Sequence, residues 1–64
     1  MKVFEVLKIL EANGWEWIRS RGSHNQFKHR VTGEVRTFAF HSRKEEVSPI
    51  KLKKIFKDFG ITLK

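Results

Sequence analysis

Two helix-like apolar patterns enclose three strand-like segments, and this order limits the possible fold more than any other feature of the sequence. From Lys2 to Asn13, apolar residues recur at helical spacing, and the charged residues lie off that stripe. Asn13-Gly14 follows at once, and both residues tolerate the left-handed conformation that ends helices. The sequence therefore predicts a helix at the N-terminal end.

A second helix is predicted near the C-terminal end. Ser48 is a good N-cap, and Pro49 occupies the first helical position, where its missing N–H is not needed. Gly60 ends the helix, and Ile61 is placed to cover a Schellman-type end. The apolar stripe between these signals comprises Leu52, Ile55, Phe56 and Phe59.

The middle of the chain changes to a strand pattern. Trp15–Arg19 is rich in aromatic and β-branched residues, His24–Arg30 alternates, and Val35–Phe40 is a third such run. Gly22-Ser23 and Thr32-Gly33-Glu34 are the turns between them. We therefore expect an α+β fold of order α-β-β-β-α, with a three-stranded antiparallel sheet covered on one face by two helices, in one domain over residues 1–64.

Size and composition exclude several classes of protein and site. A 64-residue chain has a thin stability margin, and its six Phe and two Trp supply much of the apolar area. The absence of Cys excludes disulfides and thiolate metal sites. No run reaches the roughly 18 apolar residues of a membrane span, and no signal-peptide pattern follows Met1. We expect a cytoplasmic protein with no membrane partner.

Charge indicates the class of partner. Fourteen Lys and Arg against seven Asp and Glu give a formal net charge of +7, which favours polyanions: nucleic acid, anionic lipid or an acidic protein. In the second predicted helix, Lys53, Lys54 and Lys57 lie away from the apolar stripe, with Lys51 at its edge. These lysines either follow phosphates or only solvate the helix.

His24 is the candidate for chemistry. If Phe27 faces the helices, alternation sends His24 and Lys28 to the open face, unless a bulge changes the parity. Histidine, with an unperturbed pKa near 6.5, suits the proton transfer by which a ribose 2′-OH attacks the adjacent phosphate. Gly22 and Ser23 allow close backbone approach and offer N–H groups to phosphate oxygens. The alternative is a surface histidine without a role.

The other histidines and the tryptophans carry weaker signals. His29 shares the side of Phe27, so we expect it to be a partly buried, hydrogen-bonded packing residue. His41 closes the third strand and either assists His24 or begins the loop. Because His24 and His29 lie on opposite faces, we expect no metal site, and no cofactor is implied. The tryptophans offer surfaces for base stacking, but a short chain needs them in its core.

Nearly the whole chain resembles the HicA toxin family. The most specific part is Gly22-Ser23-His24-Asn25-Gln26-Phe27-Lys28-His29, preceded by Asn13-Gly14-Trp15 and Arg19. The segment from His41 to Gly60 is similar to the C-terminal half of that family. The family often reaches the end of its third strand through a Val-Pro-type segment, where this chain has Phe38-Ala39-Phe40-His41. The role of that end is therefore open.

The resemblance implies a double-stranded-RNA-binding-domain-like fold and a type II toxin that acts as a metal-independent, ribosome-independent mRNA interferase. It also implies that His24 is the single catalytic histidine, and that a HicB-like antitoxin covers the active face. Phosphates would be positioned by Lys28 and by the lysines of the second helix. Two other readings remain: a non-catalytic RNA-binding module of the same fold, and a protein-interaction domain for an acidic partner.

Overall fold

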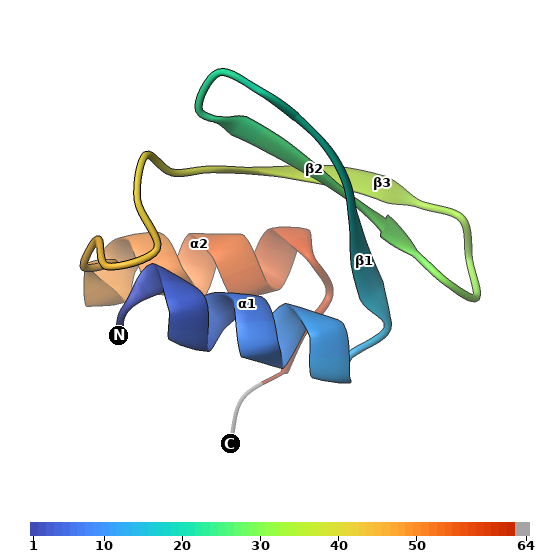
Figure 1. Cartoon of the computed structure of the whole chain (residues 1–64). Helices are drawn as coiled ribbons and strands as arrows, with labels where there is room; N and C mark the ends of the chain where they lie inside the picture. The colour runs from blue at the N-terminus through green and yellow to red at the C-terminus, as the bar shows by residue number, and fades with distance from the viewer. Residues whose placement is uncertain (63–64) are drawn as a thin grey trace.

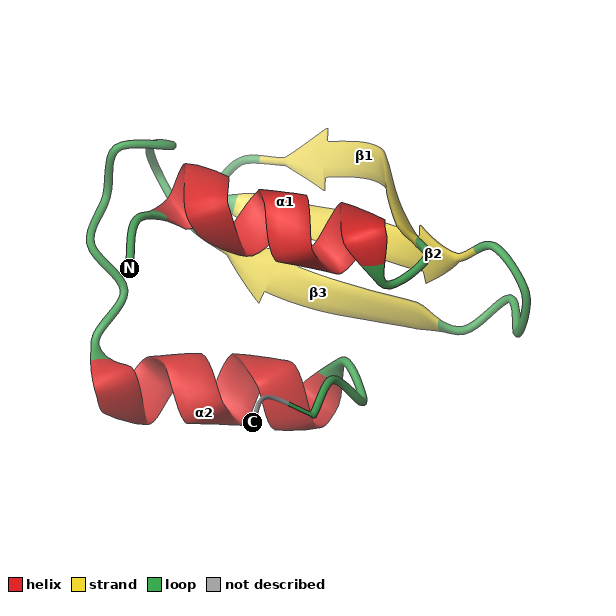
Figure 2. Cartoon of the chain, turned by 90° about the horizontal axis from the view of Figure 1, so that it is seen from below, coloured by secondary structure: helices red, strands yellow, loops and turns green. Residues whose placement is uncertain are grey.

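Two helices lie against one face of a three-stranded sheet in the computed structural model of the chain, which describes residues 1–62 (Figure 1). The strands form one antiparallel sheet in the order β1-β2-β3. Seen from below, α1 lies in front of the sheet, α2 lies beside it along the β3 side, and both helices run in the same direction (Figure 2). The predicted α-β-β-β-α order is confirmed. The elements are α1 (Val3–Ala12), β1 (Trp15–Arg21), β2 (His24–His29), β3 (Val35–Ala39) and α2 (Pro49–Asp58).

The predicted ends of α2 are confirmed in detail. Ser48 is the N-cap, and its side chain accepts a hydrogen bond from the backbone N–H of Lys51 at 3.3 Å. At the other end Gly60 has φ +65, and its N–H donates to the carbonyl of Lys57 at 3.1 Å. The N–H of Ile61 donates to the carbonyl of Phe56 at 2.8 Å, which completes a Schellman motif.

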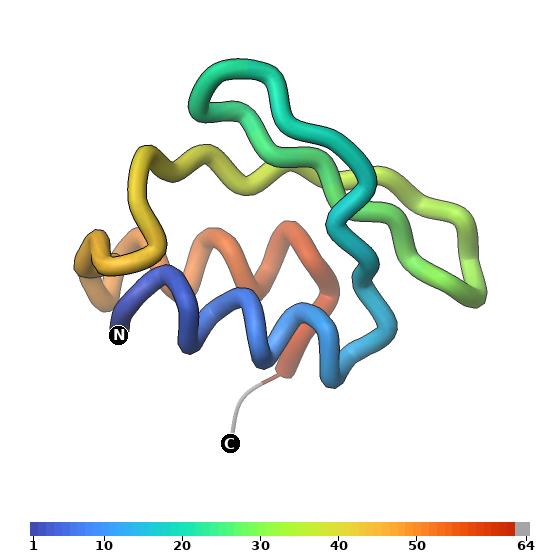
Figure 3. The backbone as a smooth tube through the Cα atoms, viewed as in Figure 1, coloured from blue at the N-terminus to red at the C-terminus, as the bar shows by residue number. Residues whose placement is uncertain are grey.

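The segment between β3 and α2 caps the first turn of α1. The backbone path carries this segment down from the sheet and past the N-terminus (Figure 3). The N–H of Val3 donates to the carbonyl of Glu45 at 2.9 Å, and the N–H of Phe4 donates to that of Arg43 at 3.0 Å. These bonds satisfy two of the amides that a helix start leaves without an intrahelical partner. The loop thus joins the two helices at one end of the molecule.

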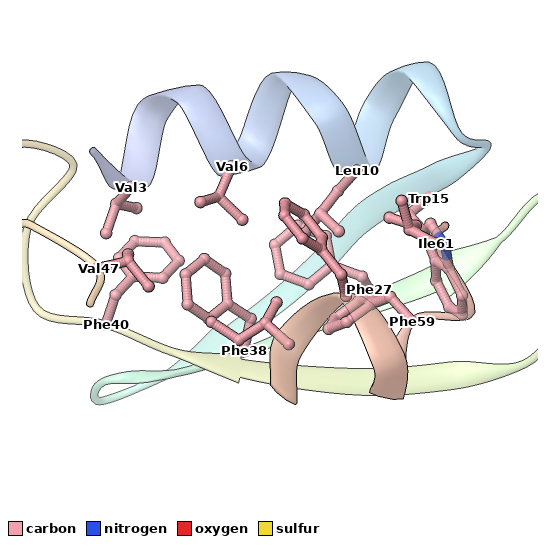
Figure 4. Close-up of a cluster of buried hydrophobic side chains, with 12 residues drawn as sticks. Val3, Val6, Leu10, Trp15, Phe27, Phe38, Phe40, Val47, Phe59 and Ile61 are labelled. Carbon is pink, nitrogen blue, oxygen red and sulfur yellow. The ribbon is translucent and has the colours of Figure 1, made fainter. Parts of the chain in front are cut away.

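Aromatic side chains fill the space between the sheet and the helices (Figure 4). The ring of Phe59 meets that of Trp15 edge-on, with centroids 4.8 Å apart, and that of Phe27 at 5.8 Å. Burying each such side chain contributes about 1.5–3 kcal/mol. The buried cluster comprises Val3, Val6, Leu10, Trp15, Phe27, Phe38, Phe40, Val47, Ile55, Phe56, Phe59 and Ile61.

His29 has the predicted packing role. Its Nε2 donates to the carbonyl of Asn13 at 3.0 Å, because a carbonyl only accepts, and its Nδ1 accepts from the N–H groups of Val31 and Thr32. The imidazole lies so close to Gly14 that a Cβ there would be 2.8 Å from Nε2. Gly14 also has φ +90. Only glycine fits this position, and the histidine joins the end of α1 to the β2–β3 turn.

Candidate active site

An irregularity in β1 decides which side chains reach the open face of the sheet. The register pairs Trp17 with Phe27 and then Arg19 with Gln26, so Ile18 is an extra residue in the strand. Directly paired residues of an antiparallel sheet share a face. Trp17 therefore faces the helices, whereas Arg19 and the residues that alternate with it face outward. Uninterrupted alternation would have left Arg19 on the side of Trp17.

His24 lies on this outward face beside two arginines. Arg21 of β1 is directly opposite His24, and Arg19 is directly opposite Gln26. These four side chains line a shallow hollow of about 160 Å³. His24 and both arginines are exposed. The predicted outward position of His24 is confirmed. The two arginines were not identified as site residues from the sequence, because strand alternation without the bulge places them on the helix-facing side.

Gly22 shapes the turn that joins Arg21 to His24. Gly22 has φ +62, whereas Ser23, like every non-glycine residue of 1–62, has a negative φ. This is the pattern of a type II′ hairpin turn, which takes glycine at its first central position. A Cβ on Gly22 would meet nothing within 4 Å, so the backbone conformation and not the space selects glycine. The tight turn holds Arg21 and His24 next to each other.

A buried hydrogen-bond network supports the turn from the helix side. Asn25 is 3% exposed, and its Oδ1 accepts from the Ser20 hydroxyl at 2.8 Å. Its Nδ2 donates to the carbonyls of Ser23 at 2.9 Å and Phe38 at 3.2 Å. Because Asn25 is adjacent to His24 and points to the other face, these bonds fix the backbone that carries the imidazole. The signal in the sequence is that Asn25, two residues before Phe27, shares the side of Phe27 by strand alternation.

The remaining predicted residues of the sheet lie further away. Lys28 faces outward, but it is four residues along β2 from His24, about 13 Å at the rise of a strand. Lys28 is paired across the strands with Glu16, whose negative charge offsets the positive charge of the lysine. His41 follows β3, where its backbone N–H donates to Glu45 Oε1 at 3.1 Å. It is not among the residues that line the hollow.

The lysines of α2 belong to the other layer of the molecule. Lys53, Lys54 and Lys57 are exposed. The helix that carries them covers the face of the sheet opposite to the one that bears His24 (Figure 1). The structure therefore does not bring these lysines to the hollow.

Both tryptophans are engaged in packing. Trp15 is buried and meets the rings of His29 and Phe59 edge-on. Trp17 is 39% exposed, but its ring stacks on Phe27, and the guanidinium of Arg43 lies 5.4 Å from its centroid. Their predicted role in the core is confirmed for Trp15, and for Trp17 in part.

The hollow combines one imidazole with two permanent positive charges. Histidine is the side chain that ordinarily exchanges a proton near neutral pH. A guanidinium group can bind two oxygens of one phosphate with two parallel hydrogen bonds. Within residues 1–62, no group of three or more His, Asp or Glu side chains is placed to hold a metal ion. No helix in that range is long and apolar enough to cross a membrane. The arrangement suits the binding of a phosphodiester and the movement of one proton beside it.

Comparison with known proteins gives a family match over most of the chain. The family model described as the HicA toxin of bacterial toxin-antitoxin matches residues 4–61. The matched range covers β1, the Gly22-Ser23 turn, β2 and α2. A search of curated proteins finds no significant match.

Proposed function

The chain belongs to the HicA toxin family of bacterial toxin–antitoxin modules, and on that premise we propose that it is an endoribonuclease that inactivates mRNA through His24. The observation that supports this most is the exposed imidazole on the open face of the sheet, with two arginines beside it. Cleavage of an RNA phosphodiester is helped by a proton acceptor for the 2′-OH and by positive charge near the phosphate, and this hollow offers both.

RNA supplies its own nucleophile, so the protein needs neither a metal nor a nucleophilic side chain. His24 accepts the proton of a ribose 2′-OH while the 2′-oxygen attacks the adjacent phosphorus. The P–O5′ bond breaks, and the products are a 2′,3′-cyclic phosphate and a 5′-hydroxyl. The N–H groups of Gly22 and Ser23 lie at the turn and offer hydrogen bonds to phosphate oxygens.

The lysines have two different roles in this proposal. Lys28 shares the outward face and binds a flanking phosphate about 13 Å along the strand. Lys53, Lys54 and Lys57 lie on the helix layer and act mainly through the long-range field, which attracts RNA to a chain of net charge +7.

The proposed protein partner is a HicB-like antitoxin in the cytoplasm. The family places this chain in a toxin–antitoxin module, which has a cognate antitoxin. Within residues 1–62 no helix covers the outward face of the sheet (Figure 1), so a partner that covers it would block access to His24. An acidic surface on that partner would match the exposed arginines.

The decisive experiment is RNA cleavage in EDTA by the purified protein and by its His24→Ala variant. We expect the wild type to cut RNA without added metal, and the variant to lose cleavage and growth arrest while its unfolding free energy stays the same. Full toxicity of His24→Ala would contradict the proposal. Wild-type protein that binds RNA in EDTA but never cuts it would instead identify a non-catalytic RNA-binding module.

His41→Ala decides whether a second histidine takes part. Because His41 does not line the hollow, we expect this variant to cleave RNA at close to the wild-type rate. A loss comparable to that of His24→Ala would make His41 the second proton-transfer group.

A further inference from the structure

The two arginines beside His24 supply positive charge to the hollow, but neither has yet been given a specific part in the cleavage step. We propose that Arg21, assisted by Arg19, grips the non-bridging oxygens of the scissile phosphodiester and stabilises the charge that builds up there during cleavage. This inference rests on the proposed RNA cleavage at His24. It makes Arg21 a second catalytic residue, because its guanidinium contacts the reacting group.

The bulge at Ile18 is what places these arginines. Directly opposed residues of an antiparallel pair have Cβ atoms about 4.5–5.5 Å apart, and diagonal neighbours about 7–8 Å apart. Arg21 is the direct neighbour of His24, and Arg19 is its diagonal neighbour through Gln26. Both guanidinium groups are thus within reach of a phosphate that touches the imidazole. Bulges next to active sites commonly re-aim side chains in this way.

The charge of the two arginines is available to a ligand. Among residues 1–62, the ion pairs engage the N-terminal amine, Lys2 and Arg36, and neither Arg19 nor Arg21. No carboxylate is among the side chains that line the hollow. Lys28, in contrast, lies opposite Glu16. Both arginines are therefore cations beside His24 that no carboxylate of residues 1–62 engages in an ion pair.

The reaction explains why arginine suits this position. When the 2′-oxygen bonds to phosphorus and its proton passes to His24, the phosphate gains negative charge on its non-bridging oxygens. A guanidinium binds two such oxygens with parallel hydrogen bonds and keeps its proton. As the P–O5′ bond breaks, the 5′-oxygen takes a proton from water, which the exposed hollow admits. The resulting hydroxide then accepts the proton from His24, so the step balances.

The test compares Arg21→Gln, Arg21→Lys and Arg19→Gln with Arg30→Gln, which removes the same charge in the β2–β3 turn. We would measure kcat and KM in EDTA, together with binding to fully 2′-O-methylated RNA, which lacks the nucleophile. Loss of one donor to a developing charge commonly lowers kcat by about 100- to 1,000-fold. We expect that loss for Arg21→Gln, with a smaller loss for Arg21→Lys and about tenfold for Arg19→Gln.

The controls separate this inference from the function on which it rests. We expect Arg30→Gln to stay within about threefold of wild type, and all variants to bind the methylated RNA within about tenfold and to unfold as wild type does. If Arg21→Gln cuts RNA as well as Arg30→Gln while His24→Ala is inactive, the inference is wrong and the proposed function stands. If the wild type itself cuts no RNA, both are wrong.

Discussion

The two faces of the sheet differ in what their side chains contact. On the helix-facing side Trp15, Phe27 and Phe38 are at most 5% exposed and packed in an aromatic cluster. On the outward side Arg21 and His24 are exposed, and both α1 and α2 lie on the other face of the sheet (Figure 1). Packing against the helices restricts which side chains the first face can hold. The side chains of the second face are exposed and can contact a ligand. Substitutions should therefore separate stability from activity according to the face on which they fall.

The largest effect on stability should come from Phe38→Ala. Phe38 is 3% exposed and packs 5.0 Å from the ring of Phe40, so its truncation leaves a cavity in the core. We expect a loss of about 3–5 kcal/mol in the free energy of unfolding, measured with urea. Thr37→Ala, next to it on the outward face, should change the value by less than about 0.5 kcal/mol. Equal effects of the two would remove the distinction between the faces.

Substitution of Gly14 and of Gly22 by Ala should destabilise the fold to different extents, because the space around the two residues differs. Gly14→Ala combines a left-handed backbone with a contact of 2.8 Å to His29, so we expect a loss of more than about 2 kcal/mol. Gly22→Ala has open space and only the backbone strain, worth about 1–2 kcal/mol. Thermal and urea unfolding of both variants would check this order, and a larger loss for Gly22→Ala would reverse it.

Asn25→Ala should affect both faces. It leaves the carbonyls of Ser23 and Phe38 without their side-chain donor and removes the acceptor of Ser20, at a cost of about 1–3 kcal/mol. Because these bonds hold the turn below His24, RNA cleavage should also fall at temperatures where the variant is fully folded. A destabilised variant with unaltered cleavage would show that the network does not position the imidazole.

The lysines of α2 test how far the outward face acts alone. Removal of a lysine that contacts a phosphate directly lowers the slope of the salt dependence of RNA binding by about one unit. Since Lys53, Lys54 and Lys57 lie on the other layer, we expect their combined change to Gln to lower affinity with a slope change below about one per lysine. A change of about three units would put these lysines against the RNA backbone.

The smallest expected effect concerns the edge where the N-terminus meets the β3–α2 segment. A hydrogen bond from the N-terminal amine, with the positive charges of that amine and Lys2, holds the pKa of Glu46 below its ordinary value. A lowered pKa in the folded state means that Glu46 stabilises the fold at neutral pH and loses this effect as the pH falls through that pKa. Glu46→Gln should therefore narrow slightly the stability difference between neutral and acidic pH. An unaltered difference would show that the ion pair adds nothing.

The helices, the caps of α2 and the inward side of His29 could be predicted, because helical periodicity, the residues that end helices and strand alternation are visible in the sequence. Periodicity defines the stripe of α2, and Ser48 and Gly60 mark its ends. The bulge at Ile18 could not be predicted in this way, because it exists only through the pairing of β1 with β2. The positions of Arg19 and Arg21 depend on that pairing. The helical spacing of the α2 lysines was evident, but their distance from His24 depends on the packing of the layers.

The most direct measurement of the central claim is an NMR titration of the protein with 2′-O-methylated RNA. If the outward hollow is the RNA site, the largest chemical-shift changes should occur at Arg19, at Arg21 and over residues 22–26, with much smaller changes over α1 and α2. Changes concentrated on α2, with none at His24 or Arg21, would contradict the assignment of the active site to this face.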